Sequence, residues 1–191
     1  MNINIVVARY NENIEWVKQF KNFVIYNKGN PINDIENQVT LSNVGREGHT
    51  YYKYICDNYY NLPNYIIFLQ GNPFDHSPNI IANIHKYLNN EKLHLNFEFL
   101  SEEIHYSTLK EESKRYPECK DIFKTFERVF KKTIIDDNEC IFGAGAQFIV
   151  SKERILKRDI EFYKNIVNIL EYSISPMEGY DIERLHKYIF I

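Results

Sequence analysis

The sequence predicts an α/β fold in which a mainly parallel sheet lies between two layers of helices. Short continuous apolar runs, typical of strands buried on both faces, recur along the chain, and segments with helical periodicity separate them. No internal repeat or flexible linker divides the 191 residues. We therefore expect one three-layer α/β domain over residues 1–191, built on a mixed, mainly parallel sheet.

Three of the expected strands lie in the first half of the chain. Apolar runs predict strands at Ile3–Ala8, Phe23–Tyr26 and Tyr65–Leu69. Apolar residues at helical spacing predict helices over Glu12–Phe23 and Arg46–Tyr60. Strands and helices therefore alternate from the start of the chain.

The second half continues this alternation. Ser77 and Pro78 have the residue types of a helix N-cap and first helical position, which predicts a helix through Leu88. Residues 93–99 alternate apolar and polar as an edge strand does, whereas 101–116 lack a clear period and are expected to be loop or partial helix. The remaining expected elements are a helix at 117–132, a glycine-containing entry into a strand at 143–151, a long helix at 152–172, and a final helix capped by Asp181.

Composition excludes several classes of protein. The net charge is −3 and no basic stripe is present, so we expect no nucleic-acid partner. The apolar run at the N-terminus is too short for a signal peptide or a membrane anchor, so we expect a soluble, cytoplasmic protein without a transmembrane segment. Three widely spaced cysteines argue against a disulfide framework or a zinc site. The sequence indicates no oligomeric state.

Two polar clusters follow predicted strands. Arg9 and Asn11 come after the first strand, and Gln70, Gly71 and Asn72 come after the strand that begins at residue 65. In open α/β sheets ligands bind beyond the carboxyl ends of strands. The two amides supply donors and acceptors, and the glycine lets the backbone approach a ligand. These residues are therefore candidate substrate-binding groups, whereas the alternative is a turn that only caps the next helix.

A third cluster, at the start of the helix expected from Arg46, combines cationic residues with glycines. Arg46 and His49 beside helix N-terminal amides make a candidate phosphate site, and Gly45 and Gly48 would admit the ligand. The alternative is a solvated face on which Arg46 and Glu47 form surface ion pairs.

Five segments, in this order, resemble a family known as a domain of unknown function of fungi, bacteria and large DNA viruses. These segments are VVARYNENIEW, NVGREGHTYYKYI, LPNYIIFLQGNPFDH, FGAGAQFIVSKERI and ERLHKYIF. The segments IVVARYNEN, IIFLQGN and FGAGAQFIVSKERI are also similar to parts of GT-A-fold glycosyltransferases. In that family the first holds the nucleotide, the second ends in two metal-binding carboxylates, and the third lines the acceptor side, which here implicates Gly145 and Gln147.

The second segment departs from the GT-A pattern, because Gln70 and Asn72 stand where the family has carboxylates. The resemblance leaves Asp75 and His76 as the metal ligands. Hard cations prefer carboxylate oxygen, so we expect either a weakly bound divalent cation, Mn²⁺ or Mg²⁺, or none. Without a metal, Arg46 and His49 would neutralise the phosphates.

The resemblance implies a glycosyltransferase that moves a sugar from a nucleotide-sugar donor to the hydroxyl of a glycan or small-molecule acceptor. Such enzymes often take a carboxylate from a helix start as catalytic base, which makes Glu183 the candidate and Glu47 the reserve. The helix dipole is a competing reason for a carboxylate at residue 183. Alternatives are a non-catalytic nucleotide- or sugar-binding module, or a phosphate-ester hydrolase using Asp75, His76 and Glu47.

Overall fold

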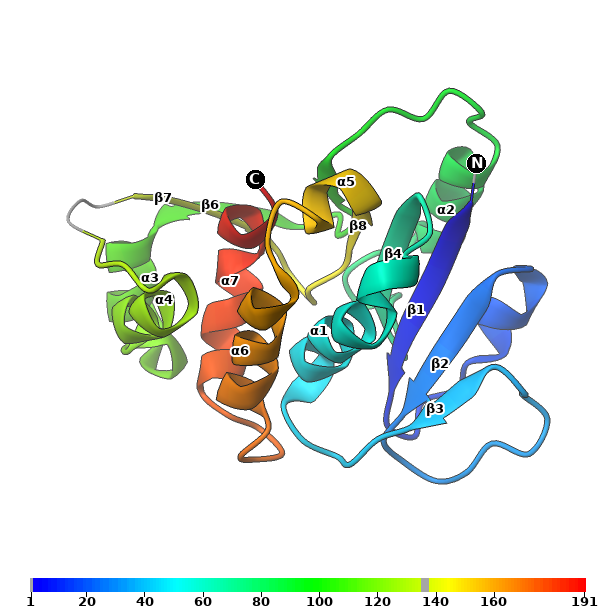
Figure 1. The fold of residues 1–191 in the computed structure, drawn as a ribbon, viewed down its shortest axis with the longest axis horizontal. Coiled ribbons are helices and arrows are strands. Elements are labelled where there is room, and N and C mark those ends of the chain that lie inside the picture. Colours follow the sequence, from blue (N-terminus) through cyan, green and yellow to red (C-terminus); the bar gives the residue numbers. More distant parts are fainter. Residues whose placement is uncertain (1, 135–137) are drawn as a thin grey trace.

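A six-stranded mixed sheet forms the centre of the computed structural model, which describes residues 2–134 and 138–191 (Figure 1). Its strands, in spatial order, are β3 (Gln38–Thr40), β2 (Phe23–Asn27), β1 (Ile3–Arg9), β4 (Tyr65–Gln70), β8 (Phe148–Ser151) and β5 (Phe97–Phe99). The first four are mutually parallel, and β8 runs antiparallel to both of its neighbours. The expected mainly parallel sheet is thus confirmed.

Helices cover both faces of this sheet. In the part of the chain that the structure describes, the α-helices are α1 (Arg46–Asn58), α2 (Ile80–Leu88), α3 (Leu109–Arg115), α4 (Ile122–Phe130), α5 (Lys152–Ile155), α6 (Ile160–Leu170) and α7 (Glu178–Phe190). Short 3₁₀ helices span Glu15–Gln19, Tyr59–Asn61 and Pro117–Cys119. A separate antiparallel ribbon, β6 (Ile104–Thr108) with β7 (Glu139–Gly143), packs against α7 (Figure 1).

Alternation along the central strands divides the core into two layers. Val6 and Phe68 point toward α1, α6 and α7, whereas Val7 and Leu69 point toward α2 and the 3₁₀ helix at Glu15–Gln19. All four side chains are fully buried. The continuous apolar runs of β1 and β4 follow from this burial on both faces.

The segment between β1 and β2 is mostly loop, so the helix expected over Glu12–Phe23 is wrong. Side chains take up the local backbone groups: Asn13 Oδ1 accepts from the Glu15 N–H at 2.9 Å, and Arg9 Nε donates to the Glu12 carbonyl at 3.0 Å. Such bonds compete with helix formation, and only a single 3₁₀ turn forms.

Two further expectations about helices and strands need correction. Residues 104–115 form β6 and α3, and a capping box between Thr108 and Glu111 begins the helix. The long helix expected over 152–172 is divided into α5 and α6, because Asp159 Oδ1 accepts from the Phe162 N–H at 2.8 Å and starts a new helix there.

The two predicted helix caps are also wrong. Ser77 is buried and donates to the Leu100 carbonyl at 2.9 Å, and α2 begins three residues later. Asp181 lies inside α7, where its carboxylate accepts a hydrogen bond from Thr125. Burial raises the pKa of Asp181 to about 6, although the bond from Thr125 opposes the shift. No helix among the described residues is long and apolar enough to cross a membrane.

Several buried polar side chains have an atom without a hydrogen-bond partner among the described residues, and His186 has two such atoms. His186 is 1% exposed, and neither ring nitrogen has a hydrogen-bond partner among the described residues. Its ring packs 4.6 Å from the ring of Phe148, centroid to centroid. Burial lowers the pKa of His186 to about 3, so the ring is neutral in the folded protein.

We predict that His186→Phe raises the free energy of unfolding by about 1–3 kcal/mol, because it removes unpaired buried nitrogens and keeps a planar ring. The gain should grow as the pH falls below about 6.5, since only the unfolded wild-type chain takes up a proton at this side chain in that range. Urea unfolding at about pH 5 and about pH 8 measures it. His94→Phe, at an exposed position, is the control; an equal pH dependence in His186→Phe and wild type would contradict the prediction.

Candidate functional site

The carboxyl ends of three parallel strands meet at one edge of the sheet. Register pairs Arg9 of β1 with Asn27 of β2, and Ala8 of β1 with Gln70 of β4. The polar segments that follow these strands are therefore brought together. The segment between β2 and β3 supplies a third cluster there, which was not among the polar clusters predicted from the sequence.

A first cavity of about 720 Å³ opens at this edge. Predicted site residues that line it are Arg9, Arg46, Glu47, Gln70, Gly71, Asn72 and Asp75. The sequence analysis missed Lys28, which follows β2, and Ile174 and Ser175 from the loop between α6 and α7. Lys28 could have been found from its place after a parallel strand, whereas nothing in the sequence indicates that the α6–α7 loop reaches this edge.

A second cavity of about 370 Å³ adjoins the first. Arg46 and Gln70 line both cavities, so the two meet at these side chains. Predicted residues His76, Gly145 and Glu183 line the second cavity. Its aromatic and cationic wall was not predicted from the sequence. This wall consists of His105, Tyr116, Phe142, Tyr180 and Arg184.

Arg46 is held firmly where the cavities meet. Its guanidinium lies 4.2 Å above the centre of the Tyr180 ring, and its Nε is 3.7 Å from Glu47 Oε2. Burial alone would lower the pKa of Arg46, but Glu47 and Tyr180 outweigh burial and raise it. The residue also has a left-handed backbone, with φ at 51°, which is uncommon outside glycine. Arg46 is thus a fixed, permanently charged group.

The start of α1 is anchored to the loop before α7. The N–H groups of Gly45 and Arg46 donate to the carbonyls of Ser173 and Ile174, at 2.8 and 3.3 Å. These two amides are therefore engaged, which removes them from the expected phosphate site. Lys28 Nζ donates to the carbonyls of Val44 and Arg46. Burial lowers its pKa to about 8, although Glu47 opposes the shift, so Lys28 is still largely protonated near neutral pH.

The glycines beside Arg46 serve packing within the protein. A Cβ on Gly45 would lie 2.9 Å from the Leu170 carbonyl oxygen, and Gly45 has a φ of 66°. Gly48 is buried on the face of α1 that meets Leu170 and Ile182. The expectation that both glycines admit a ligand therefore needs correction, because Gly45 and Gly48 face neighbouring helices and neither lines the two cavities.

Glu183 is the most perturbed carboxylate of the second cavity. Its side chain is 13% exposed, and Oε1 accepts from the Gly145 N–H at 2.8 Å. Burial, followed by the charge of Glu47, raises its pKa to about 7, while Arg184 and the Gly145 N–H act in the opposite direction. Glu183 lies in the second turn of α7, because the helix begins at Glu178 and not at Asp181 as expected. The helix dipole is a weaker reason for a carboxylate there than at the first turn.

Arg9 lines the first cavity, but its hydrogen-bonding groups are committed to the surrounding loops. Besides Glu12, its guanidinium donates to Asn27 Oδ1 at 2.7 Å and to the Asn30 carbonyl at 3.0 Å. Asn11 acts in the same way, since its Oδ1 accepts from the Asn30 N–H at 2.9 Å. Both residues hold the loops after β1 and β2 together.

Two other predicted binding residues lie outside both cavities. His49 is 6% exposed, and burial together with Lys28 lowers its pKa to about 4. It is neutral at pH 7 and cannot supply the expected positive charge. Gln147 is fully buried and donates to the Pro73 carbonyl at 3.0 Å, so it supports the loop after β4 from beneath.

The predicted metal ligands do not converge. Asp75 lines the first cavity and accepts a hydrogen bond from Asn72 Nδ2 at 3.0 Å, whereas His76 lines the second and packs against Gly145. Among residues 2–134 and 138–191, no three His, Cys, Asp or Glu side chains are grouped as a metal would require. These donors therefore do not fit a divalent cation.

The chain has an α/β fold with a polar cleft at the carboxyl ends of its parallel strands. It belongs to a family described as protein of unknown function (DUF3431), which is matched over residues 5–191. No curated protein matches the chain, and no solved structure does.

We predict that Gly145→Ala disrupts the second cavity. Gly145 has a φ of 80°, and an added Cβ would lie 2.4 Å from His76 Cδ2. The strained backbone and the displaced ring should lower the free energy of unfolding by about 1–3 kcal/mol. Alanine keeps the backbone N–H of residue 145, but the displaced backbone should weaken its bond to Glu183 and raise the pKa of that carboxyl further, as carboxyl NMR titration would detect.

Gly48→Ala is the matched control for this variant. Its added Cβ would meet Leu170 Cδ1 at 3.4 Å, which is ordinary contact, and alanine favours a helix over glycine by about 1 kcal/mol. It should therefore be neutral or stabilising, with the pKa of Glu183 unchanged. If the two variants behave alike, the close contact between Gly145 and His76 does not shape the cavity.

Proposed function

We propose that this protein is a glycosyltransferase that moves a sugar from a nucleotide-sugar donor to an acceptor hydroxyl. One observation carries the proposal: two cavities of different chemistry meet at Arg46 and Gln70. The first cavity is lined by three cationic side chains, Arg9, Lys28 and Arg46, together with three carboxylates, and the second cavity holds a carboxylate whose pKa lies near 7. Transfer between two substrates needs such a pair of adjoining sites.

The first cavity is the proposed donor site. Arg46 presents a planar guanidinium that can bind two phosphate oxygens, and Tyr180 fixes its orientation. Lys28 adds a second positive charge beside it, and the carboxylates of Glu12, Glu47 and Asp75 line the same cavity and offset the field. The left-handed backbone of Arg46 also supports a functional role, because strained residues are concentrated at functional sites.

The second cavity is the proposed acceptor site, and Glu183 is the proposed base. A base is most effective when its pKa lies near the working pH, and about 7 meets that condition. The ionised carboxylate would take the proton of the acceptor hydroxyl. Aromatic side chains, Tyr116, Phe142 and Tyr180, line the same cavity, and the guanidinium groups of Arg46 and Arg184 already pack against their rings.

The proposed reaction is a direct displacement at the anomeric carbon. The acceptor oxygen loses its proton to Glu183 and forms a bond to that carbon, while the bond to the diphosphate oxygen breaks. The leaving diphosphate takes the bonding electrons, and Arg46 stabilises the charge that develops on it. Gln70, which lines both cavities, lies where the transferred sugar would be.

The hydrolase alternative receives less support. It requires Asp75, His76 and Glu47 to act together, but His76 lines the second cavity and the two carboxylates line the first. The binding-module alternative keeps the donor site and lacks the base. Turnover therefore separates it from the proposed enzyme.

We predict that Glu183→Gln lowers transfer by roughly a hundredfold or more while donor affinity is retained, because the base is lost and the first cavity is kept. The assay is release of nucleoside diphosphate from a panel of uridine, guanosine and adenosine diphosphate sugars, with mixed sugar acceptors. Wild-type turnover should rise with pH through about 7, as Glu183 ionises.

Stability provides an independent check on this variant. A carboxyl whose folded pKa is about 7, against an ordinary value of 4.5, binds more protons when folded between these values. The contribution of Glu183 to stability should therefore fall as the pH rises through this range, so the stability of Glu183→Gln relative to the wild type should increase with pH. Glu161→Gln, at an exposed position on α6, is the control. Full activity of Glu183→Gln would exclude Glu183 as the base. If Glu47→Gln were also fully active, the proposed mechanism would be excluded.

A further inference from the structure

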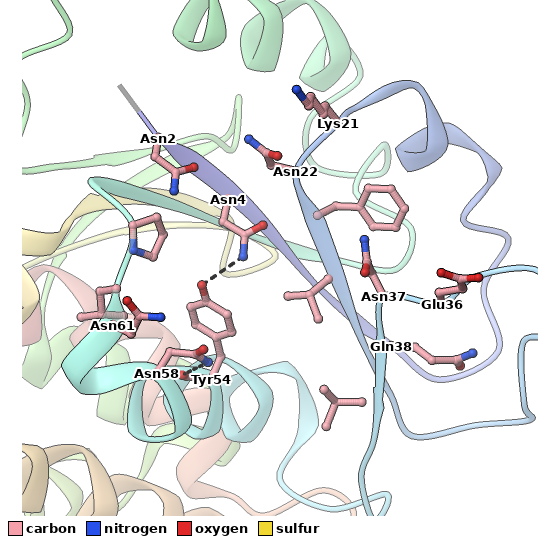
Figure 2. A pocket seen from close by; sticks show the side chains of 15 residues that line it. Asn2, Asn4, Lys21, Asn22, Glu36, Asn37, Gln38, Tyr54, Asn58 and Asn61 are labelled. Carbon is pink, nitrogen blue, oxygen red and sulfur yellow. Dashed lines mark hydrogen bonds between the residues drawn. The ribbon is translucent and has the colours of Figure 1, made fainter.

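A cavity of about 570 Å³ lies at the opposite end of the parallel strands from the candidate active site (Figure 2). It is formed around the amino-terminal ends of β1, β2 and β3 and the carboxyl end of α1. A seven-residue strand such as β1 spans roughly 20 Å, so this cavity is separate from the two described above. It takes no part in the proposed function.

Side-chain amides dominate the wall of this cavity. Six of its 15 lining residues are asparagine, whereas asparagine accounts for 22 of the 191 residues of the chain. The six are Asn2, Asn4, Asn22, Asn37, Asn58 and Asn61. They come from four separate segments of the chain, so the fold gathers them, and they do not reflect one asparagine-rich stretch (Figure 2).

The usual structural uses of asparagine do not explain this cluster. None of the six has the left-handed backbone that asparagine tolerates, and none caps a helix through its side chain. Among the described residues, the side chains of Asn22, Asn37 and Asn61 make no hydrogen bond to protein. Each of these three keeps two donors and one acceptor available for a ligand.

Other parts of the wall are pre-arranged. Asn4 Nδ2 donates to the Tyr54 hydroxyl at 3.0 Å, and Asn58 Nδ2 donates to the Tyr54 carbonyl at 2.9 Å (Figure 2). Gln38 Nε2 is held by the carbonyls of Ile32 and Ile35. These three amides are therefore oriented before any ligand binds, which lowers the entropic cost of binding.

The charge and floor of the cavity indicate the chemistry of the ligand. Lys21 and Glu36 are its only charged lining residues among those described, and their charges cancel. Phe23, Val24 and Leu62 add apolar surface to the wall of the cavity. A neutral site with amide donors and acceptors over apolar patches suits a ligand with many hydroxyls and C–H faces, and does not suit an anion.

We propose that this amide-lined cavity binds a neutral carbohydrate. The hydroxyls of the sugar exchange hydrogen bonds with the free amides of Asn22, Asn37 and Asn61, and the C–H faces of its rings pack on the apolar floor. Because the cavity is open, several sugar units of a chain contact it in succession.

The test is an NMR titration of the ¹⁵N-labelled full chain with maltohexaose, cellohexaose and chitohexaose, each to about 10 mM. A hexamer of galacturonate serves as the anionic comparison. We expect at least one neutral hexamer to shift the side-chain NH₂ signals of Asn22, Asn37 and Asn61. Asn37→Ala combined with Asn61→Ala should weaken this binding by about tenfold, since two hydrogen-bonding amides are lost.

Asn83→Ala combined with Asn168→Ala, at positions on α2 and α6 outside this cavity, is the matched control and should bind as the wild type does. The side-chain amides of Asn37 and Asn61 make no hydrogen bond to the described part of the protein, so both substitutions should leave the fold intact. Each single variant can be measured if the double variant does not fold. The proposal is overturned if no neutral hexamer binds, if the rim variants bind unchanged, or if only the galacturonate hexamer shifts these signals.

Discussion

Parallel pairing of β1 with both β2 and β4 is the constraint on which the candidate site depends. It brings Arg9, Asn27 and Gln70 to one edge of the sheet, and the loops that follow can then close around a shared cleft. Burial on both faces fixes the register. A slip of one residue would move every side chain of a strand to the opposite face and would carry the polar residues at the strand end into a helical layer. The amide-lined cavity at the opposite edge depends on the same pairing.

A second set of contacts turns that cleft into two cavities. The carbonyls of Ser173 and Ile174 hold the start of α1, and Lys28 binds it from β2, so Arg46 lies between elements that are distant in sequence. Glu47 interacts electrostatically with both Arg46 and Glu183. It lies 3.7 Å from the Arg46 guanidinium and helps to raise the pKa of Glu183. Electrostatics thus couples Arg46 to the carboxylate of the second cavity.

The sequence was sufficient for the buried strands and insufficient for what surrounds them. Continuous apolar runs identified β1, β2 and β4, and position after a strand made Gln70, Gly71 and Asn72 candidates, all of which line the first cavity. Side-chain bonds to the backbone broke the expected helices at Asn13 and Asp159, and periodicity does not register such bonds. The burial of His49 and Gln147 follows from the packing of α1 and β8, so only the three-dimensional structure could separate them from the cavity residues.

The central claim is that the first cavity binds the diphosphate of a nucleotide-sugar beside Arg46. Titration of the ¹⁵N-labelled protein with uridine, guanosine and adenosine diphosphates tests it most directly, since backbone amides report the location of binding. The account predicts that at least one of them shifts the amides of Tyr10, Glu47, Gly71 and Asn72, and that Arg46→Lys weakens the effect because lysine cannot bind two oxygens as a planar fork. If no diphosphate perturbs these amides, or if the shifts gather around Asn4 and Asn58 instead, the claim is contradicted.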